Sequence, residues 1–147
     1  MNNVSIKLSE HFTLRELTKT NTGIENVPNE VQVKNLRRLC GWLEMLRSEW
    51  NKRYGDGDDP IIINSGYRSE AVNKAVGGAK GSNHLTGCAV DIRVLGIEQL
   101  VRYATILLDI SDESQEDFDE LLLERSPNGC YWLHSPSAHL VTGDECG

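Results

Sequence analysis

The segment Gly81–Ile92, GSNHLTGCAVDI, leads from a polar loop into a short apolar run. His84 lies in the loop or at the start of the run, and Asp91 follows seven residues later between two apolar residues. Residues 88–94, CAVDIRV, predict a β-strand because their apolar and β-branched side chains suit a sheet. A carboxylate in such a strand needs a partner, so Asp91 is either a structural carboxylate with a partner or a functional residue.

Length and charge limit the classes of protein that fit this chain. With 147 residues and a net charge of −7, we expect one globular domain over residues 1–147 that buries a substantial core. The acidic balance argues against a nucleic-acid partner, and no apolar stretch approaches the roughly 18 residues of a membrane span. A soluble monomer is the expectation that follows.

The apolar periodicity predicts alternating helices and strands around the opening segment. A long helix is expected over residues 28–54, where apolar residues recur every three to four positions and Pro28 suits the first turn. The acidic residues 111–117, SDESQED, are expected to form a loop. Further helices are expected over residues 13–20, 69–76 and 97–109, and further strands over residues 60–64, 118–124 and 130–136. This pattern predicts an α+β fold with helices packed on a small, largely antiparallel sheet.

The four cysteines are scattered along the chain without a Cys-x-x-Cys pair. This argues against a thiolate zinc site and predicts no disulfide framework. Cys40 and Cys88 are interpreted as small buried apolar side chains.

A second histidine, His134, suggests a chemical role for Asp91. His134 lies in residues 130–136, CYWLHSP, and with His84 and Asp91 it completes a set of two imidazoles and one carboxylate. Such a set binds zinc and leaves a coordination position for water, as in catalytic rather than structural sites. The alternative is that Asp91 pairs with an arginine or with backbone amides.

Five segments of the chain resemble, in order, those of the M15 zinc peptidases, the D-alanyl-D-alanine carboxypeptidase group. They are SEHFTLREL, SGYRSEAVNKAVGG, SNHLTGCAVDI, FDELLLE and YWLHSP. The most specific element is Ser-x-His-x-x-Gly-x-Ala-x-Asp, filled by Ser82, His84, Gly87, Ala89 and Asp91. The resemblance implies the fold shared by these peptidases and the hedgehog signalling domain. It also implies that His84, Asp91 and His134 bind Zn²⁺.

The resemblance implies that Glu124, the last residue of FDELLLE, is the catalytic acid and base that moves the proton. Ten positions separate Glu124 from His134, and Tyr131 stands three before His134, where other branches of the family keep an acid. Residues 125–130, RSPNGC, are interpreted as an insertion in a hairpin that still returns Glu124 to the metal. The alternative is a solvent-facing glutamate at the end of a strand.

Arg68 and Ser82 match further residues of the family site. Arg68 is expected to act in catalysis and substrate binding, by holding the developing oxyanion or a substrate carboxylate. The alternative for Arg68 is an ion pair with Asp91 or another carboxylate. Ser82 is expected to bind substrate or, alternatively, only to shape its loop. His11 lies in the first matching segment and is interpreted as structural or exposed.

The function that the resemblance implies is zinc-dependent hydrolysis of amide bonds in peptidoglycan stem peptides. Carboxypeptidase action on D-Ala-D-Ala and endopeptidase action both fit, and a phage or prophage endolysin suits the small domain. No secretory signal is visible in the sequence, so we expect the chain to stay cytoplasmic until release, or to act on the wall after export or lysis. The alternative is a non-catalytic zinc-containing module that binds cell-wall peptides or a protein partner.

Overall fold

The computed structural model describes residues 6–114, 122–125 and 131–136. The helices are α1 (Leu14–Thr18), α2 (Glu30–Arg53), α3 (Glu70–Ala75), the 3₁₀ helix η1 (Asn83–Thr86) and α4 (Ile97–Ser114). The strands are β1 (Ile63–Ser65), β2 (Ala89–Arg93), β3 (Leu122–Arg125) and β4 (Tyr131–Pro136).

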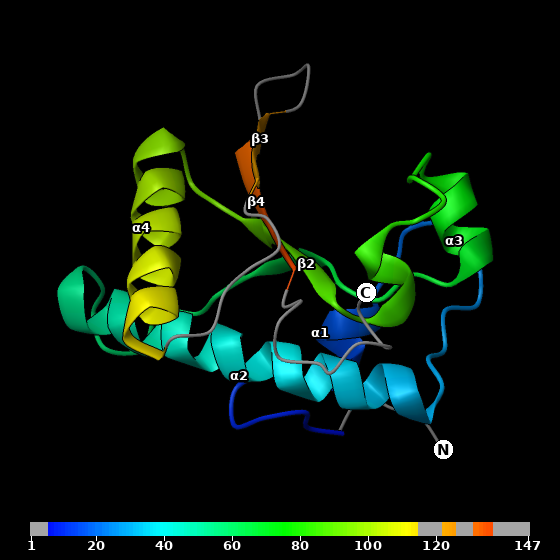
Figure 1. The fold of residues 1–147 in the computed structure, drawn as a ribbon, viewed down its shortest axis with the longest axis horizontal. Helices are drawn as coiled ribbons and strands as arrows, with labels where there is room; N and C mark the ends of the chain where they lie inside the picture. The colour runs from blue at the N-terminus through cyan, green and yellow to red at the C-terminus, as the bar shows by residue number, and fades with distance from the viewer. Residues whose placement is uncertain (1–5, 115–121, 126–130, 137–147) are drawn as a thin grey trace.

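Within these described residues the strands form one antiparallel sheet in the order β1-β2-β4-β3. The long helix α2 runs along one side of the molecule, and α4 packs against both α2 and the sheet (Figure 1). The expected α+β architecture, with helices on a small antiparallel sheet, is confirmed.

The helix α2 supplies much of the core. Its N-terminus is closed by a capping box, in which Asn29 accepts from the Gln32 amide and Gln32 accepts from the Asn29 amide. The apolar stripe expected from the periodicity is buried: Leu36, Leu39, Cys40, Leu43, Leu46 and Trp50.

Three boundaries differ from the expected ones. The helix α2 begins at Glu30 rather than Pro28, because Asn29 supplies the cap. The first strand is displaced toward Ile63–Ser65 from the expected residues 60–64. The helix α4 continues to Ser114, so residues 111–114 are not a loop; Ile110 and Ser111 are 6% and 7% exposed and extend its buried face.

The cysteine interpretation holds only in part. Cys40 is a free, fully buried thiol, as expected. Cys88 is also buried, but it forms a disulfide bond whose partner lies outside the described residues. The expectation of no disulfide was therefore wrong for Cys88, since the spacing of cysteines along a chain does not reveal which ones the fold brings together.

No helix within the described parts of the chain is both long enough and apolar enough to cross a membrane.

The N-terminal segment is fastened to α2 by one carboxylate. Glu44 accepts hydrogen bonds from the Ser9 hydroxyl at 2.5 Å and the His11 amide at 2.7 Å, and its other oxygen lies 2.6 Å from His11 Nδ1. Burial raises the pKa of Glu44, but the hydrogen bonds from Ser9 and His11 outweigh it and lower the pKa below 4.5. His11 therefore has the structural role expected of it.

Replacing Glu44 with Gln is expected to cost about 1–2 kcal/mol of unfolding free energy at pH 7, because the hydrogen bonds from Ser9 and His11 lose their charged acceptor. A carboxyl with a lowered folded-state pKa stabilises the fold above its ordinary pKa and loses this effect as the pH falls through the folded value. Urea unfolding at pH 7 and pH 3 measures the difference, which should shrink at the lower pH. Glu49→Gln, which removes only exposed ion pairs of α2, is the control. Equal losses for the two variants would contradict this account of Glu44.

Candidate metal centre

His84 lies in η1, a short helix held between the sheet and α2. Ser82 caps it by accepting from the His84 amide at 3.2 Å, and Gly87 ends it in the left-handed region at φ 79°. A Cβ at Gly87 would lie 2.7 Å from the Gln32 carbonyl oxygen, so glycine is needed for both the turn and the close approach to α2. Asn35 of α2 also donates to the Thr86 carbonyl at 2.9 Å. His84 is therefore on a rigid helical turn, not on a strand.

The ring of His84 is held in one orientation. The side chain is 2% exposed, and its Nδ1 lies 2.6 Å from the carbonyl oxygen of Gly66. A carbonyl only accepts, so Nδ1 donates to it, and Nε2 is the ring nitrogen that faces Asp91. Such an outer hydrogen bond is the usual way in which a metal-binding histidine is oriented.

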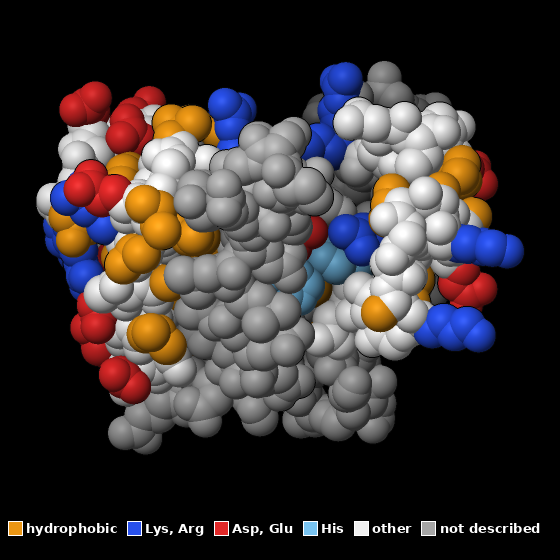
Figure 2. Space-filling view, turned by 90° about the horizontal axis from the view of Figure 1, so that it is seen from above, with side chains coloured by type: hydrophobic (Ala, Val, Ile, Leu, Met, Phe, Trp, Pro, Cys, Tyr) orange, Lys and Arg blue, Asp and Glu red, His pale blue; other side chains and the backbone are white. Residues whose placement is uncertain are grey.

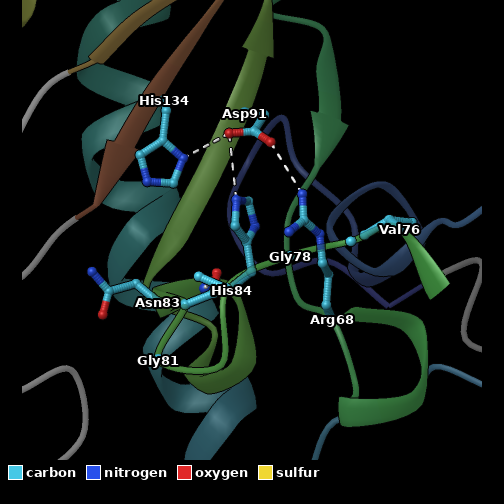
Figure 3. Close-up of a pocket in the computed structure, with 11 residues that line it drawn as sticks. Arg68, Val76, Gly78, Gly81, Asn83, His84, Asp91 and His134 are labelled. Atoms are coloured by element: carbon cyan, nitrogen blue, oxygen red, sulfur yellow. Dashed lines mark hydrogen bonds and ion pairs between the residues drawn. The ribbon is translucent and has the colours of Figure 1, made fainter. Parts of the chain in front are cut away.

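Sheet register brings the other two candidate ligands together. Asp91 of β2 pairs directly with His134 of β4, although the two are 43 residues apart in the chain. His134 Nδ1 lies 2.7 Å from Asp91 Oδ1, and His84 Nε2 lies 3.4 Å from the same oxygen. Figure 3 shows both rings converging on this oxygen from different elements. The three predicted ligands therefore meet at one point.

Asp91 is ionised at neutral pH despite its position. Burial by itself raises the pKa of its carboxyl, but hydrogen bonds from the His134 and His84 rings and the charge on those rings outweigh burial. The pKa of Asp91 is held well below its usual range as a result. The site thus offers a fixed negative charge between two imidazoles.

This donor set fits zinc. One ligand atom from each of His84, Asp91 and His134 lies within 4.8 Å of the others, close enough for one ion to reach all three. The available atoms are imidazole nitrogens and a carboxylate oxygen, which zinc accepts with bonds of about 2.0–2.2 Å. Three protein ligands leave one tetrahedral position for water or substrate.

A cavity of about 510 Å³ opens over the three ligands. Arg68, Ser82 and Asn83 line it together with residues 76–79 and Gly81. Figure 2 shows histidine side chains deep in a hollow of this face, with a basic and an acidic side chain beside them. The candidate metal position is therefore open to a ligand from one side.

Arg68 lies on the side of Asp91 opposite to His134 (Figure 3). Its Nη2 is 3.4 Å from Asp91 Oδ2, so each carboxylate oxygen of Asp91 faces a different partner. Its backbone amide donates to the His84 carbonyl at 2.9 Å, which ties it to the first ligand. The expected alternative, an ion pair with Asp91, is present in the structure, and Arg68 also lines the cavity.

Ser82 caps η1 through its hydroxyl and also lines the cavity. The loop-shaping role considered for it is therefore present. Whether it also contacts substrate stays a prediction.

Glu124 lies on β3, where its backbone position pairs with Trp132 of β4. Trp132 is two residues before His134, and alternate positions of a strand share a face. Position 124 therefore belongs to the same face of the sheet as His134, as its diagonal neighbour. Arg125 pairs with Tyr131, so β3 and β4 are antiparallel neighbours despite the ten positions between Glu124 and His134. The side chain of Glu124 lies outside the described part of the structure.

Two supporting residues do not emerge from the motif analysis. Arg68 Nε donates to the Ser65 hydroxyl, and Arg68 Nη1 donates to the Asn73 side chain, both at 3.2 Å. Asn73 is buried in the short helix α3. Its polar side chain follows the buried Val72 in the sequence, and this is the signal that could have pointed to it.

Comparison with known proteins agrees with this geometry. Residues 10–111 match the family model Peptidase M15, a stretch that includes Arg68, Ser82, His84 and Asp91. The match covers more than half of the chain, which therefore belongs to the M15 family of zinc peptidases.

The chain is also similar to the protein named zinc D-Ala-D-Ala carboxypeptidase of Streptomyces albus G. The two are 48% identical over 40 residues, which are 27% of this chain and 16% of the relative. The chain thus matches only about a sixth of that protein's length. The expectations of the M15 family, of a zinc metallopeptidase and of zinc as the cofactor are confirmed.

Proposed function

We propose that this chain hydrolyses amide bonds in peptidoglycan stem peptides with one zinc ion held by His84, Asp91 and His134. The observation that carries the proposal is the convergence of these side chains beneath an open cavity beside Arg68. A zinc ion in such a site polarises a carbonyl and lowers the pKa of water toward about 7.

The residues around the ligands keep the site ready for that chemistry. The Gly66 carbonyl accepts from His84 Nδ1, so the ring is oriented with Nε2 facing the other two proposed ligands. Arg68 keeps Asp91 Oδ2 engaged, which leaves Oδ1 facing the two imidazoles. Both contacts reduce the reorganisation that metal binding requires.

Glu124 is proposed as the proton carrier. It accepts the proton of the attacking water and delivers it to the departing amine nitrogen. The register that places position 124 diagonal to His134 on one face of the sheet supports this role. Diagonal neighbours are about 7–8 Å apart at Cα, a gap that a glutamate and a water molecule can bridge.

Arg68 is proposed to bind the negative charge of the substrate, either the developing oxyanion or a terminal carboxylate. Its guanidinium lines the cavity and has a fixed fork of donors suited to a carboxylate. Ser82, on the same wall, is proposed to donate a hydrogen bond to the substrate. A bound substrate that excludes water from the cavity would strengthen the attraction between Arg68 and the negative charge of the substrate.

The relative's name supports carboxypeptidase action on D-Ala-D-Ala, and endopeptidase cleavage within the stem is the other form of the same chemistry. We further propose that residues 1–147 act as a single domain and that a phage or prophage lysis role suits it.

The test is a mass-spectrometric analysis of purified peptidoglycan of several chemotypes after incubation with the zinc-loaded protein. New peptide termini are expected from the wild type, and their masses identify the cleaved bond. The control is Arg102→Gln, which changes a partly exposed cation of α4 that is not among the residues lining the cavity. Zinc-loaded wild type that binds peptidoglycan but releases no termini would instead indicate a non-catalytic binding module.

A further inference from the structure

Asn73 is a buried amide whose two polar ends contact two different parts of the site. Its side chain is 4% exposed, Oδ1 accepts from Arg68 Nη1 at 3.2 Å, and Nδ2 donates to the Ala79 carbonyl at 2.9 Å. The reversed amide would place donor against donor and acceptor against acceptor. Only one orientation of the Asn73 side chain therefore satisfies its surroundings.

The second contact of Asn73 fixes a wall of the cavity. Ala79 lines the cavity, and the neighbouring Gly78 donates its amide to the Asn73 carbonyl at 2.8 Å. A Cβ at Gly78 would overlap Asn73 Oδ1 and lie 3.0 Å from Arg68 Nη1. The wall can approach the guanidinium this closely only because residue 78 has no side chain.

The guanidinium of Arg68 is consequently held from three sides. Ser65 accepts from Nε, Asn73 from Nη1 and Asp91 from Nη2. A guanidinium has five N–H groups, so two of those of Arg68 have no partner among the described residues. Because Arg68 lines the cavity, these two are the donors that a substrate anion can use.

We propose that Asn73 is a positioning residue. It holds the Arg68 guanidinium and the cavity wall of residues 77–79 in fixed positions, so that together they bind the anionic group of the substrate. This inference rests on the role proposed for Arg68. Without Asn73, Nη1 loses its acceptor and rotates toward water or toward Asp91, and the wall loses its anchor. The anion then meets a mobile cation instead of an oriented pair of donors.

Two substitutions test the role of Asn73, one at Asn73 itself and one at Gly78 beside it. Asn73→Leu keeps the approximate volume and removes both hydrogen bonds, and Gly78→Ala displaces the amide from the wall. Each is expected to lower kcat/KM on peptidoglycan fragments by about 10- to 100-fold, the range of a buried hydrogen bond to a charged group. Lys74→Ala, an exposed neighbour on α3, is the control and should keep the wild-type value.

A double-mutant cycle separates positioning from general structural support. In an Arg68→Ala background, Asn73→Leu and Gly78→Ala should lower kcat/KM no further, because the group that they position is absent. Equal losses in both backgrounds would overturn the proposal.

A readout that needs no turnover is the NMR signal of the Arg68 guanidinium in isotopically labelled, zinc-loaded protein, assigned by its loss in Arg68→Ala. Slow side-chain rotation and slow proton exchange are expected in the wild type and the Lys74→Ala control, and fast averaging in Asn73→Leu and Gly78→Ala. Unchanged Arg68 signals in folded variants would refute the positioning role. A different outcome separates the two proposals. If Arg68→Ala keeps full activity while the Arg68 signals change in Asn73→Leu and Gly78→Ala, Asn73 positions the guanidinium, but Arg68 does not bind the substrate anion.

Discussion

Replacing Glu124 with Gln is expected to lower kcat/KM by about 10²- to 10⁴-fold, the usual contribution of general acid–base catalysis. The amide of glutamine has nearly the shape of the carboxyl group but does not accept a proton at neutral pH. Zinc content and the unfolding midpoint should stay at wild-type values, because Glu124 is not one of the three proposed ligands, His84, Asp91 and His134.

Steady-state kinetics on a defined muropeptide measures this effect, with Glu113→Gln as the matched control. Glu113 is an exposed glutamate near the end of α4, and its loss should leave kcat/KM unchanged. Undiminished turnover by Glu124→Gln would remove Glu124 from the mechanism and leave the proton carrier to be found elsewhere.

Replacing His84 with Ala is expected to lower zinc affinity by more than about 100-fold. Loss of a residue that only hydrogen-bonds to a metal ligand already costs up to about 100-fold, and loss of the ligand itself should cost more. The change removes the Nε2 ligand and also leaves the Gly66 carbonyl without its donor. Turnover should fall with the zinc, to the level of the metal-free wild type.

Competition with a chromophoric chelator measures the zinc affinity of wild type and variant. His11→Ala is the control, since His11 contacts Glu44 and Glu10 and is not part of the metal cluster. Retention of one tightly bound zinc by His84→Ala would show that the ion occupies another place.

Local sequence patterns were sufficient for most of the fold. The apolar stripe of α2 and the short strand around Asp91 follow from side-chain periodicity and β-branched content, and both are present. The boundaries were less certain because they depend on tertiary contacts, as where Ile110 and Ser111 continue the buried face of α4.

The site was predictable as a set of residue types but not as a geometry. Motif spacing indicated His84, Asp91 and His134, whereas their meeting depends on the pairing of β2 with β4 across 43 residues. The 3₁₀ turn that carries His84 depends on its docking against α2 through Asn35. No local pattern contains these long-range contacts.

Two features escaped the sequence analysis for the same reason. The role of Asn73 depends on Arg68 and Ala79, which its side chain reaches only once α3 is folded beside the cavity. The disulfide of Cys88 depends on a partner that the fold supplies.

The central claim is that the zinc ion held by His84, Asp91 and His134 is the one that supports hydrolysis. It is tested most directly by titrating zinc into the metal-free protein while bound zinc and muropeptide turnover are measured in the same samples. The account predicts that both rise together and saturate at about one zinc per chain, as expected for a single site with three protein ligands. Turnover that persists without zinc, or a fully zinc-loaded chain that cleaves no muropeptide, would contradict it.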